Sequence, residues 1–127
     1  MFANDILKNN QTFAVIGVSP DPEKYSYRIF KRLLENGYQT YGISPRYENI
    51  DGIPIYPDLS SVPAKMEVAV FVVNPKIGAT YVTQCQEAGV QYLWMQPGTY
   101  DDALIDTLSQ SQIPYVLDCI LQRCPEK

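Results

Sequence analysis

Histidine is absent from this chain of 127 residues, and so is any long apolar run. Without histidine, the chain has no histidine-based catalytic triad and no histidine-ligated metal. No apolar run approaches the ~20 residues that a membrane-spanning helix needs. The N-terminus lacks the basic and apolar regions of a signal peptide. We therefore expect a cytoplasmic protein with no membrane partner.

Cysteine and positive charge are also scarce. The three cysteines, Cys85, Cys119 and Cys124, show no paired C-x-x-C spacing, so we expect free thiols and no structural zinc site. Ten Lys and Arg against fourteen Asp and Glu give a formal net charge of −4. This balance disfavours non-specific binding to nucleic acid or an anionic membrane, so an anionic ligand would need a local site.

The sequence contains strands and helices in alternation, within what we expect to be one domain over residues 1–127. This pattern predicts an α/β fold of the Rossmann-like, doubly wound kind, with a mostly parallel sheet and helices on both faces. The predicted strands cover 12–17, 38–43, 53–56, 68–73, 90–95 and 115–117. The predicted helices cover 5–9, 26–36, 78–88 and 101–109, with one helical turn at 58–62, and no element is assigned from Asp118 onward.

The first predicted strand runs through a glycine turn into a helix, which is typical of the first half of a nucleotide-binding βαβ unit. Gly17, Val18 and Ser19 form that turn, although the full Gly-x-Gly-x-x-Gly pattern is missing. The N-terminus of the following helix would present free N–H groups and the positive end of the helix dipole to a phosphate.

The residues at the end of the second predicted strand indicate which class of nucleotide the site would suit. A site for NAD usually has Asp or Glu there, whereas this chain has Ser44, Pro45 and Arg46. A guanidinium suits a ribose that carries an extra phosphate. Both the 3′-phosphate of coenzyme A and the 2′-phosphate of NADP meet that description, and a solvated surface arginine is the alternative.

Other candidates lie near the helix start and at the ends of later strands. Lys24 and Arg28 are four residues apart, share a helix face with Tyr25 between them, and could clamp a pyrophosphate. Ligands in such sheets bind beyond the carboxyl ends of the strands. The candidates at those ends are Asn74, Pro75, Lys76 and Gln96.

At these residues the chain resembles the small stand-alone proteins of the CoA-binding domain superfamily and, more remotely, the nucleotide-binding domain of succinyl-CoA synthetase α subunits. The matching segments are 14–19, 24–28, 33–38, 44–45, 52–57, 75–76 and 93–96, with a late cysteine at 119. The resemblance implies that the glycine turn contacts the CoA pyrophosphate, that Pro45 and Arg46 contact the adenosine and its 3′-phosphate, and that Asn74 and Pro75 lie nearby. The chain departs from the family in having Ser44 where Asn is frequent, and in lacking a histidine after Cys119.

The resulting hypothesis is a protein that binds coenzyme A or acyl-CoA, with no catalytic residue and no metal ligand assigned. An NADP-binding or redox-sensing Rossmann protein and an interaction module without ligand are the alternatives. Cys119 is either a buried thiol or one that forms a mixed disulfide with CoA. Ten tyrosines, a residue type enriched at interfaces, leave a homodimer open.

Overall fold

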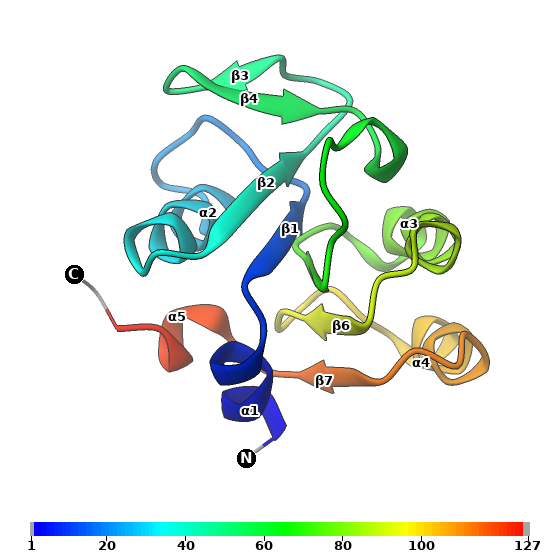
Figure 1. The fold of residues 1–127 in the computed structure, drawn as a ribbon. Helices are drawn as coiled ribbons and strands as arrows, with labels where there is room; N and C mark the ends of the chain where they lie inside the picture. The colour runs from blue at the N-terminus through cyan, green and yellow to red at the C-terminus, as the bar shows by residue number, and fades with distance from the viewer. Residues whose placement is uncertain (1, 126–127) are drawn as a thin grey trace.

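The computed structural model describes residues 2–125 and shows a sheet covered by helices on both faces (Figure 1). The strands are β1 (Thr12–Ile16), β2 (Gln39–Ile43), β3 (Asn49–Ile50), β4 (Ile53–Tyr56), β5 (Val68–Phe71), β6 (Tyr92–Met95) and β7 (Tyr115–Leu117). The helices are α1 (Phe2–Asn9), α2 (Tyr25–Glu35), α3 (Pro75–Ala88), α4 (Asp102–Gln110) and α5 (Ile120–Arg123), with a 3-10 turn, η1 (Leu59–Ser61). The predicted α/β class with a mostly parallel sheet is confirmed.

The seven strands lie in the order β3-β4-β2-β1-β5-β6-β7. Neighbouring strands from β4 to β7 are parallel, and β3 pairs with β4 in the antiparallel sense. The chain leaves β1 for β2 on one side and later crosses to β5 on the other side. The strand order therefore reverses between β1 and β5, which is where such sheets bind ligands.

Alternate residues of the central strands face two separate cores. Phe13 and Val15 pack on the side of α1, α2 and α5, while Ala14 and Ile16 pack on the side of α3 and α4. Figure 1 shows these two groups of helices on opposite sides of the sheet. All four of these strand residues are fully buried, so β1 is a central strand apolar on both faces.

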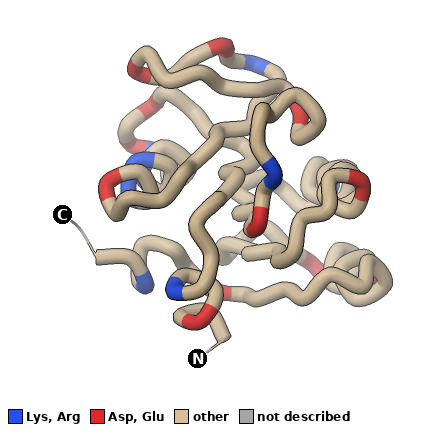
Figure 2. The backbone as a smooth tube through the Cα atoms, in the orientation of Figure 1, with Lys and Arg blue, Asp and Glu red and all other residues tan. Residues whose placement is uncertain are grey.

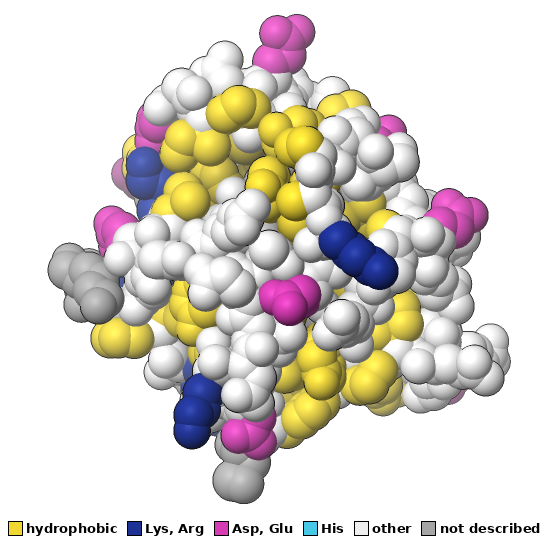
Figure 3. All heavy atoms as spheres, viewed as in Figure 1, with side chains coloured by type: hydrophobic (Ala, Val, Ile, Leu, Met, Phe, Trp, Pro, Cys, Tyr) yellow, Lys and Arg dark blue, Asp and Glu magenta, His cyan; other side chains and the backbone are white. Residues whose placement is uncertain are grey.

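Charged residues lie on the helices and loops, and no strand within residues 2–125 contains one (Figure 2). On the face seen in Figure 3, hydrophobic side chains gather in separate groups with polar surface between them. Among the described residues no helix is both long and apolar enough to span a membrane.

Several predicted boundaries were wrong, each for a local reason. Helix α3 begins at Pro75 and not at Gly78, because the Asn74 side chain caps it and proline is well suited to the first helical position. The strand expected over 68–73 ends at Phe71, since the chain turns toward that cap. Helix α1 begins at Phe2 and not at Asp5. The short elements β3 and α5 were not predicted because neither is long enough to show a period.

Candidate functional site

A cavity of about 670 Å³ opens at the carboxyl ends of β1, β2 and β5, across the reversal in strand order. Its walls come from the loop after β1, the first turn of α2, the loop after β2, and one face of α3. The predicted candidates that line it are Gly17, Val18, Ser19, Lys24, Tyr25, Ser44, Pro45 and Arg46. Residues far apart in the sequence therefore meet where the sheet topology leads us to expect a ligand.

The glycine turn is shaped first of all by its neighbours in the sheet. Gly17 has a φ of +98°, in the region that side chains other than glycine rarely adopt. A Cβ atom there would lie 2.6 Å from the carbonyl oxygen of Val72 and 2.5 Å from Cγ1 of Val73. The Gly17 N–H donates to the Ile43 carbonyl at 2.8 Å. Glycine is thus required by packing against the chain beyond β5, whether or not a phosphate approaches the turn.

The first turn of α2 faces the cavity with its N–H groups free. Lys24 occupies the N-cap position but makes no side-chain cap, and the first turn contains no acidic residue. Within the described residues, no acceptor is recorded for the N–H groups of Tyr25, Ser26 and Tyr27. These groups and the helix dipole give this end of α2 a local positive potential in a protein of negative net charge.

Ser26, which the sequence analysis did not select, adds a hydroxyl to this end of α2. The residue is only 6% exposed and lines the cavity. No hydrogen bond of its hydroxyl to another described residue is recorded. Every side-chain nitrogen or oxygen sealed from solvent in the described part of the chain has a partner. The Ser26 hydroxyl therefore opens into the cavity, where a ligand oxygen can reach it.

Two cations and one carboxylate stand at the cavity wall. Neither Lys24 nor Arg46 takes part in the ion pairs recorded within residues 2–125, which join Lys31 to Asp51 and Arg123 to Asp118. The Arg46 backbone N–H donates to the Ser44 hydroxyl at 3.2 Å, which shapes the loop after β2. The third charge is Asp21, whose carboxylate accepts from the Glu23 N–H at 3.0 Å. Two cations and one carboxylate leave this wall of the cavity with a net positive charge.

The far wall of the cavity is apolar and comes from α3 and the chain beyond β5. Val73, Ile77 and Tyr81 line it, and Ile77 is exposed. Tyr47, which follows β2, also lines the cavity. Nothing in the local sequence marks these residues as ligand contacts, so only the fold brings them to a site. The cavity therefore offers a polar, positive end and a hydrophobic end.

Five predicted candidates lie outside this cavity lining, and four of them are near the start of α2 or α3. Arg28 lies over the Tyr25 ring, with Cζ 5.5 Å from the ring centroid. The Asn74 side chain accepts from the Ile77 N–H at 3.0 Å and so caps α3, in which Pro75 is the first residue. Lys76 is exposed in the first turn of the same helix. The site prediction for these residues stays untested, and three of them have a structural role.

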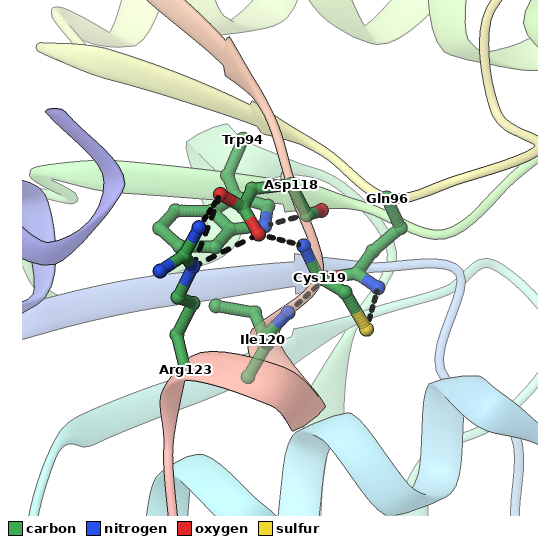
Figure 4. Close-up of polar contacts among 6 residues, drawn as sticks. All are labelled: Trp94, Gln96, Asp118, Cys119, Ile120 and Arg123. Carbon is green, nitrogen blue, oxygen red and sulfur yellow. Dashed lines mark hydrogen bonds and ion pairs between the residues drawn. The ribbon is translucent and has the colours of Figure 1, made fainter. Parts of the chain in front are cut away.

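Gln96 also lies outside the cavity lining, in a cluster that attaches α5 to the sheet (Figure 4). Its buried amide accepts from the Ile120 N–H at 2.8 Å and donates to the Cys119 sulfur at 3.4 Å. The Trp94 indole donates to the Asp118 carbonyl at 2.9 Å. Both hydrogen-bonding groups of the Gln96 amide are thus occupied within the protein, as expected of a residue that holds a fold together.

The same cluster shifts the acidity of its carboxylate. Burial would raise the pKa of Asp118, but hydrogen bonds from Arg123 and from the Cys119 N–H hold that pKa below its usual value.

Two of the three cysteines are buried thiols. Burial raises the pKa of the Cys85 thiol to about 12, and it raises the pKa of Cys124 as well. Both thiols therefore stay protonated near neutral pH, and Cys85 is a core residue of α3 as expected.

A parallel α/β sheet with a cavity at the reversal of strand order is typical of nucleotide-binding domains. A family model for the CoA binding domain matches residues 11–125, and the chain belongs to that family. The resemblance found in the sequence is confirmed. No group of three or more His, Cys, Asp or Glu residues able to hold a metal ion occurs in the described part of the chain.

The chain is similar to parts of larger enzymes and to whole small proteins. It is 34% identical over 88 residues to the acetate–CoA ligase (ADP-forming) II subunit alpha of Pyrococcus furiosus, matching 68% of this chain and 19% of that subunit. A hypothetical protein from Pyrococcus horikoshii superposes with a TM-score of 0.88 at 32% identity, over 94% of this chain and 84% of that one. A dinucleotide-forming acetyl-coenzyme A synthetase from Candidatus Korarchaeum cryptofilum superposes with a TM-score of 0.75 at 26% identity. The match covers 88% of this chain and 27% of that one. The chain thus spans a fifth or less of the curated relatives.

Proposed function

We propose that this protein binds coenzyme A or an acyl-CoA in the cavity between β1, β2 and β5. The observation that carries the proposal is the open first turn of α2, where the Ser26 hydroxyl and N–H groups without an acceptor in residues 2–125 border the cavity, beside two cations that form no ion pair within those residues. Such a turn is suited to a pyrophosphate, because backbone N–H groups and the helix dipole both favour an anion. Membership of the CoA binding domain family supports coenzyme A as the carrier of that anion.

The two ends of the cavity suit the two ends of coenzyme A. The pyrophosphate would lie between Val18, Ser19 and the start of α2, and Arg46 would contact the 3′-phosphate of the ribose. The pantetheine arm would then lie along Ile77 and Tyr81, where the wall is apolar. Binding of this kind needs no net positive charge on the protein, since the cations stand beside the phosphates.

The proposal keeps NADP as a competitor, because Arg46 would serve a 2′-phosphate as well as a 3′-phosphate. It disfavours NAD, because the residues directly after β2 are Ser44, Pro45 and Arg46, with no carboxylate at the position where an NAD site usually has one. The names of the relatives favour coenzyme A over either dinucleotide, since those proteins are CoA ligases and an acetyl-coenzyme A synthetase. Which acyl group is carried is a matter for the experiment.

The test is isothermal titration calorimetry of the purified protein with CoA, acetyl-CoA, NADP and NAD, together with mass spectrometry of small molecules that copurify with it. We expect CoA or acetyl-CoA to bind more tightly than either dinucleotide. Binding of NAD that is tighter than that of CoA would contradict the proposal. Binding of NADP as tight as that of CoA would leave the redox-sensing alternative standing.

Two secondary proposals concern the protein's setting. We propose a cytoplasmic location, which the free thiols of Cys85, Cys119 and Cys124 support. We also propose a homodimer, supported by exposed Leu117 on β7, which has a strand neighbour on one side alone within residues 2–125. Sedimentation of the purified protein tests the second proposal, and a monomer at micromolar concentration would contradict it.

A further inference from the structure

Tyr25 is the most exposed of the large hydrophobic side chains in the described part of the chain. Its side chain is 64% exposed, compared with 46% for Ile77 and 43% for Leu117. It stands at the first position of α2 and lines the cavity, beside the turn that we assign to the pyrophosphate. An aromatic ring left in water at the mouth of a binding cavity has surface to offer to a ligand.

Arg28 holds this ring from one side. The guanidinium carbon of Arg28 lies 5.5 Å from the ring centroid, one helical turn further along α2. A cation over one face of a tyrosine stabilises the ring in place and leaves the opposite face open. Arg28 does not line the cavity, and its guanidinium lies over the Tyr25 ring instead.

The position of Tyr25 matches one portion of a nucleotide better than any other. Tyr25 stands on α2, which packs against β2, the strand that Arg46 and Tyr47 follow. Ile77 and Tyr81 stand on α3, which packs on the opposite face of the sheet. A ribose whose phosphate contacts Arg46 would therefore carry its base toward the side of α2. Flat bases stack on aromatic rings through their π-faces, and a single such contact contributes measurably to affinity.

From this geometry we propose that the open face of Tyr25 stacks against the adenine base of the ligand and that Arg28 is the positioning residue for the ring. The inference rests on the proposed function and extends it to the base. Tyr25 contributes its ring, so a phenylalanine would serve in its place. Loss of the ring would lower the affinity for every ligand that contains adenine. The affinity for the part of CoA without adenosine would stay the same.

The experiment compares Tyr25→Ala and Tyr25→Phe with the wild type, using CoA, ADP and 4′-phosphopantetheine, which has no adenosine. Tyr100→Ala is the matched control, because Tyr100 is also a partly exposed tyrosine but does not line the cavity. We expect Tyr25→Ala to weaken CoA and ADP about tenfold, which is within the range of a stacking contact. We expect the affinity for 4′-phosphopantetheine to change less than twofold (roughly the scatter between distant surface variants). Tyr25→Phe and Tyr100→Ala should both behave like the wild type.

The role of Arg28 is tested by the ultraviolet signal of stacking. An effect of Arg28 on the stability of α2 alone would leave that signal unchanged. Stacking lowers the ultraviolet absorbance of adenine, and this hypochromic change is measured at saturating ligand. It should be lost in Tyr25→Ala, reduced in Arg28→Gln and restored in Arg28→Lys, which keeps the cation over the ring.

Several results would overturn the inference. Unchanged CoA affinity in Tyr25→Ala, equal weakening of 4′-phosphopantetheine, or a Tyr25→Phe variant as weak as Tyr25→Ala would each do so. The ADP titration separates the inference from the proposed function. If the wild type binds ADP with the expected dependence on Tyr25 but does not bind CoA, the stacking surface stands and the coenzyme A assignment fails. If it binds neither, both fail.

Discussion

Helices α2, α3 and α4 each begin beyond the carboxyl end of a parallel strand, but their N-termini are capped differently. In α3 the Asn74 side chain accepts from the Ile77 N–H at 3.0 Å. In α4 the Asp101 side chain accepts from the Leu104 N–H at 2.9 Å. Helix α2 has Lys24 at that position, with no side-chain cap and no acid in its first turn.

The difference shows how a protein of net charge −4 can make a site for an anion. Capping an N-terminus contributes about 1 kcal/mol to stability, and α2 does without this contribution. Its free N–H groups and the Ser26 hydroxyl face the cavity instead, and the cation at the cap position adds to the positive end of the helix dipole. The capped ends of α3 and α4 stabilise the fold, whereas on the proposed function the uncapped end of α2 would bind the ligand.

The largest expected effect comes from giving α2 the kind of cap that α4 has. In Lys24→Asp, the new carboxylate can cap the first turn, so we expect the free energy of unfolding to rise by about 0.5–1 kcal/mol. The same carboxylate would repel the pyrophosphate and replace a favourable cation, so CoA affinity should fall about a hundredfold or more. Thermal denaturation and calorimetry measure the two effects.

Lys65→Asp is the control for this change, because it alters the net charge equally from an exposed position before β5, at the other edge of the sheet. Its CoA affinity should stay within about twofold of the wild type at moderate salt. A Lys24→Asp variant that is more stable and still binds CoA normally would place the phosphates elsewhere.

A smaller, ligand-selective effect is expected at Arg46. Arg46→Ala should weaken CoA about tenfold to a hundredfold, since a charge-assisted hydrogen bond contributes roughly 1.5–3 kcal/mol. Dephospho-CoA lacks the 3′-phosphate, and its affinity should change little. Lys76→Ala removes an exposed cation that does not line the cavity, so it should leave both affinities unchanged. Equal weakening of the two ligands by Arg46→Ala would mean that Arg46 does not contact the 3′-phosphate.

The smallest effect on binding is expected from the capped helix. Asn74→Ala removes the α3 cap, so the free energy of unfolding should fall by about 1 kcal/mol and the melting temperature by about 4 °C. CoA affinity should not change, because Asn74 does not line the cavity. Scanning calorimetry with and without CoA measures both quantities. A loss of affinity without a loss of stability would return Asn74 to the ligand site, where the sequence analysis placed it.

The sequence predicted the βαβ frame because its signals are local. An apolar run from Phe13 to Ile16, a glycine and an amphipathic helix are each readable over a few residues, and the structure has all three. The alternation of strands and helices then sufficed for the class of fold and for the edge of the sheet at which the cavity opens.

The roles of individual site residues could not be predicted, because they depend on contacts that only the fold creates. An asparagine after a strand looks the same whether it caps a helix, as Asn74 does, or contacts a ligand. Gln96 was selected at a strand end, yet its amide is occupied by Ile120 and Cys119. Ser26 was passed over, because nothing local distinguishes a serine that opens into a cavity from one on the surface. Gly17 was interpreted through a ligand, whereas contact with Val72 already requires glycine there.

On the proposed function, the pyrophosphate of the ligand lies on the open first turn of α2. The direct measurement is a titration of the ¹⁵N-labelled protein with CoA, followed through its backbone amide resonances. We predict large downfield proton shifts for the Tyr25, Ser26 and Tyr27 amides, as expected of N–H groups that gain a charged acceptor. The Leu104 amide, already bonded to its cap and outside the cavity lining, should shift little. Saturating CoA that leaves the first three amides unmoved would contradict the claim.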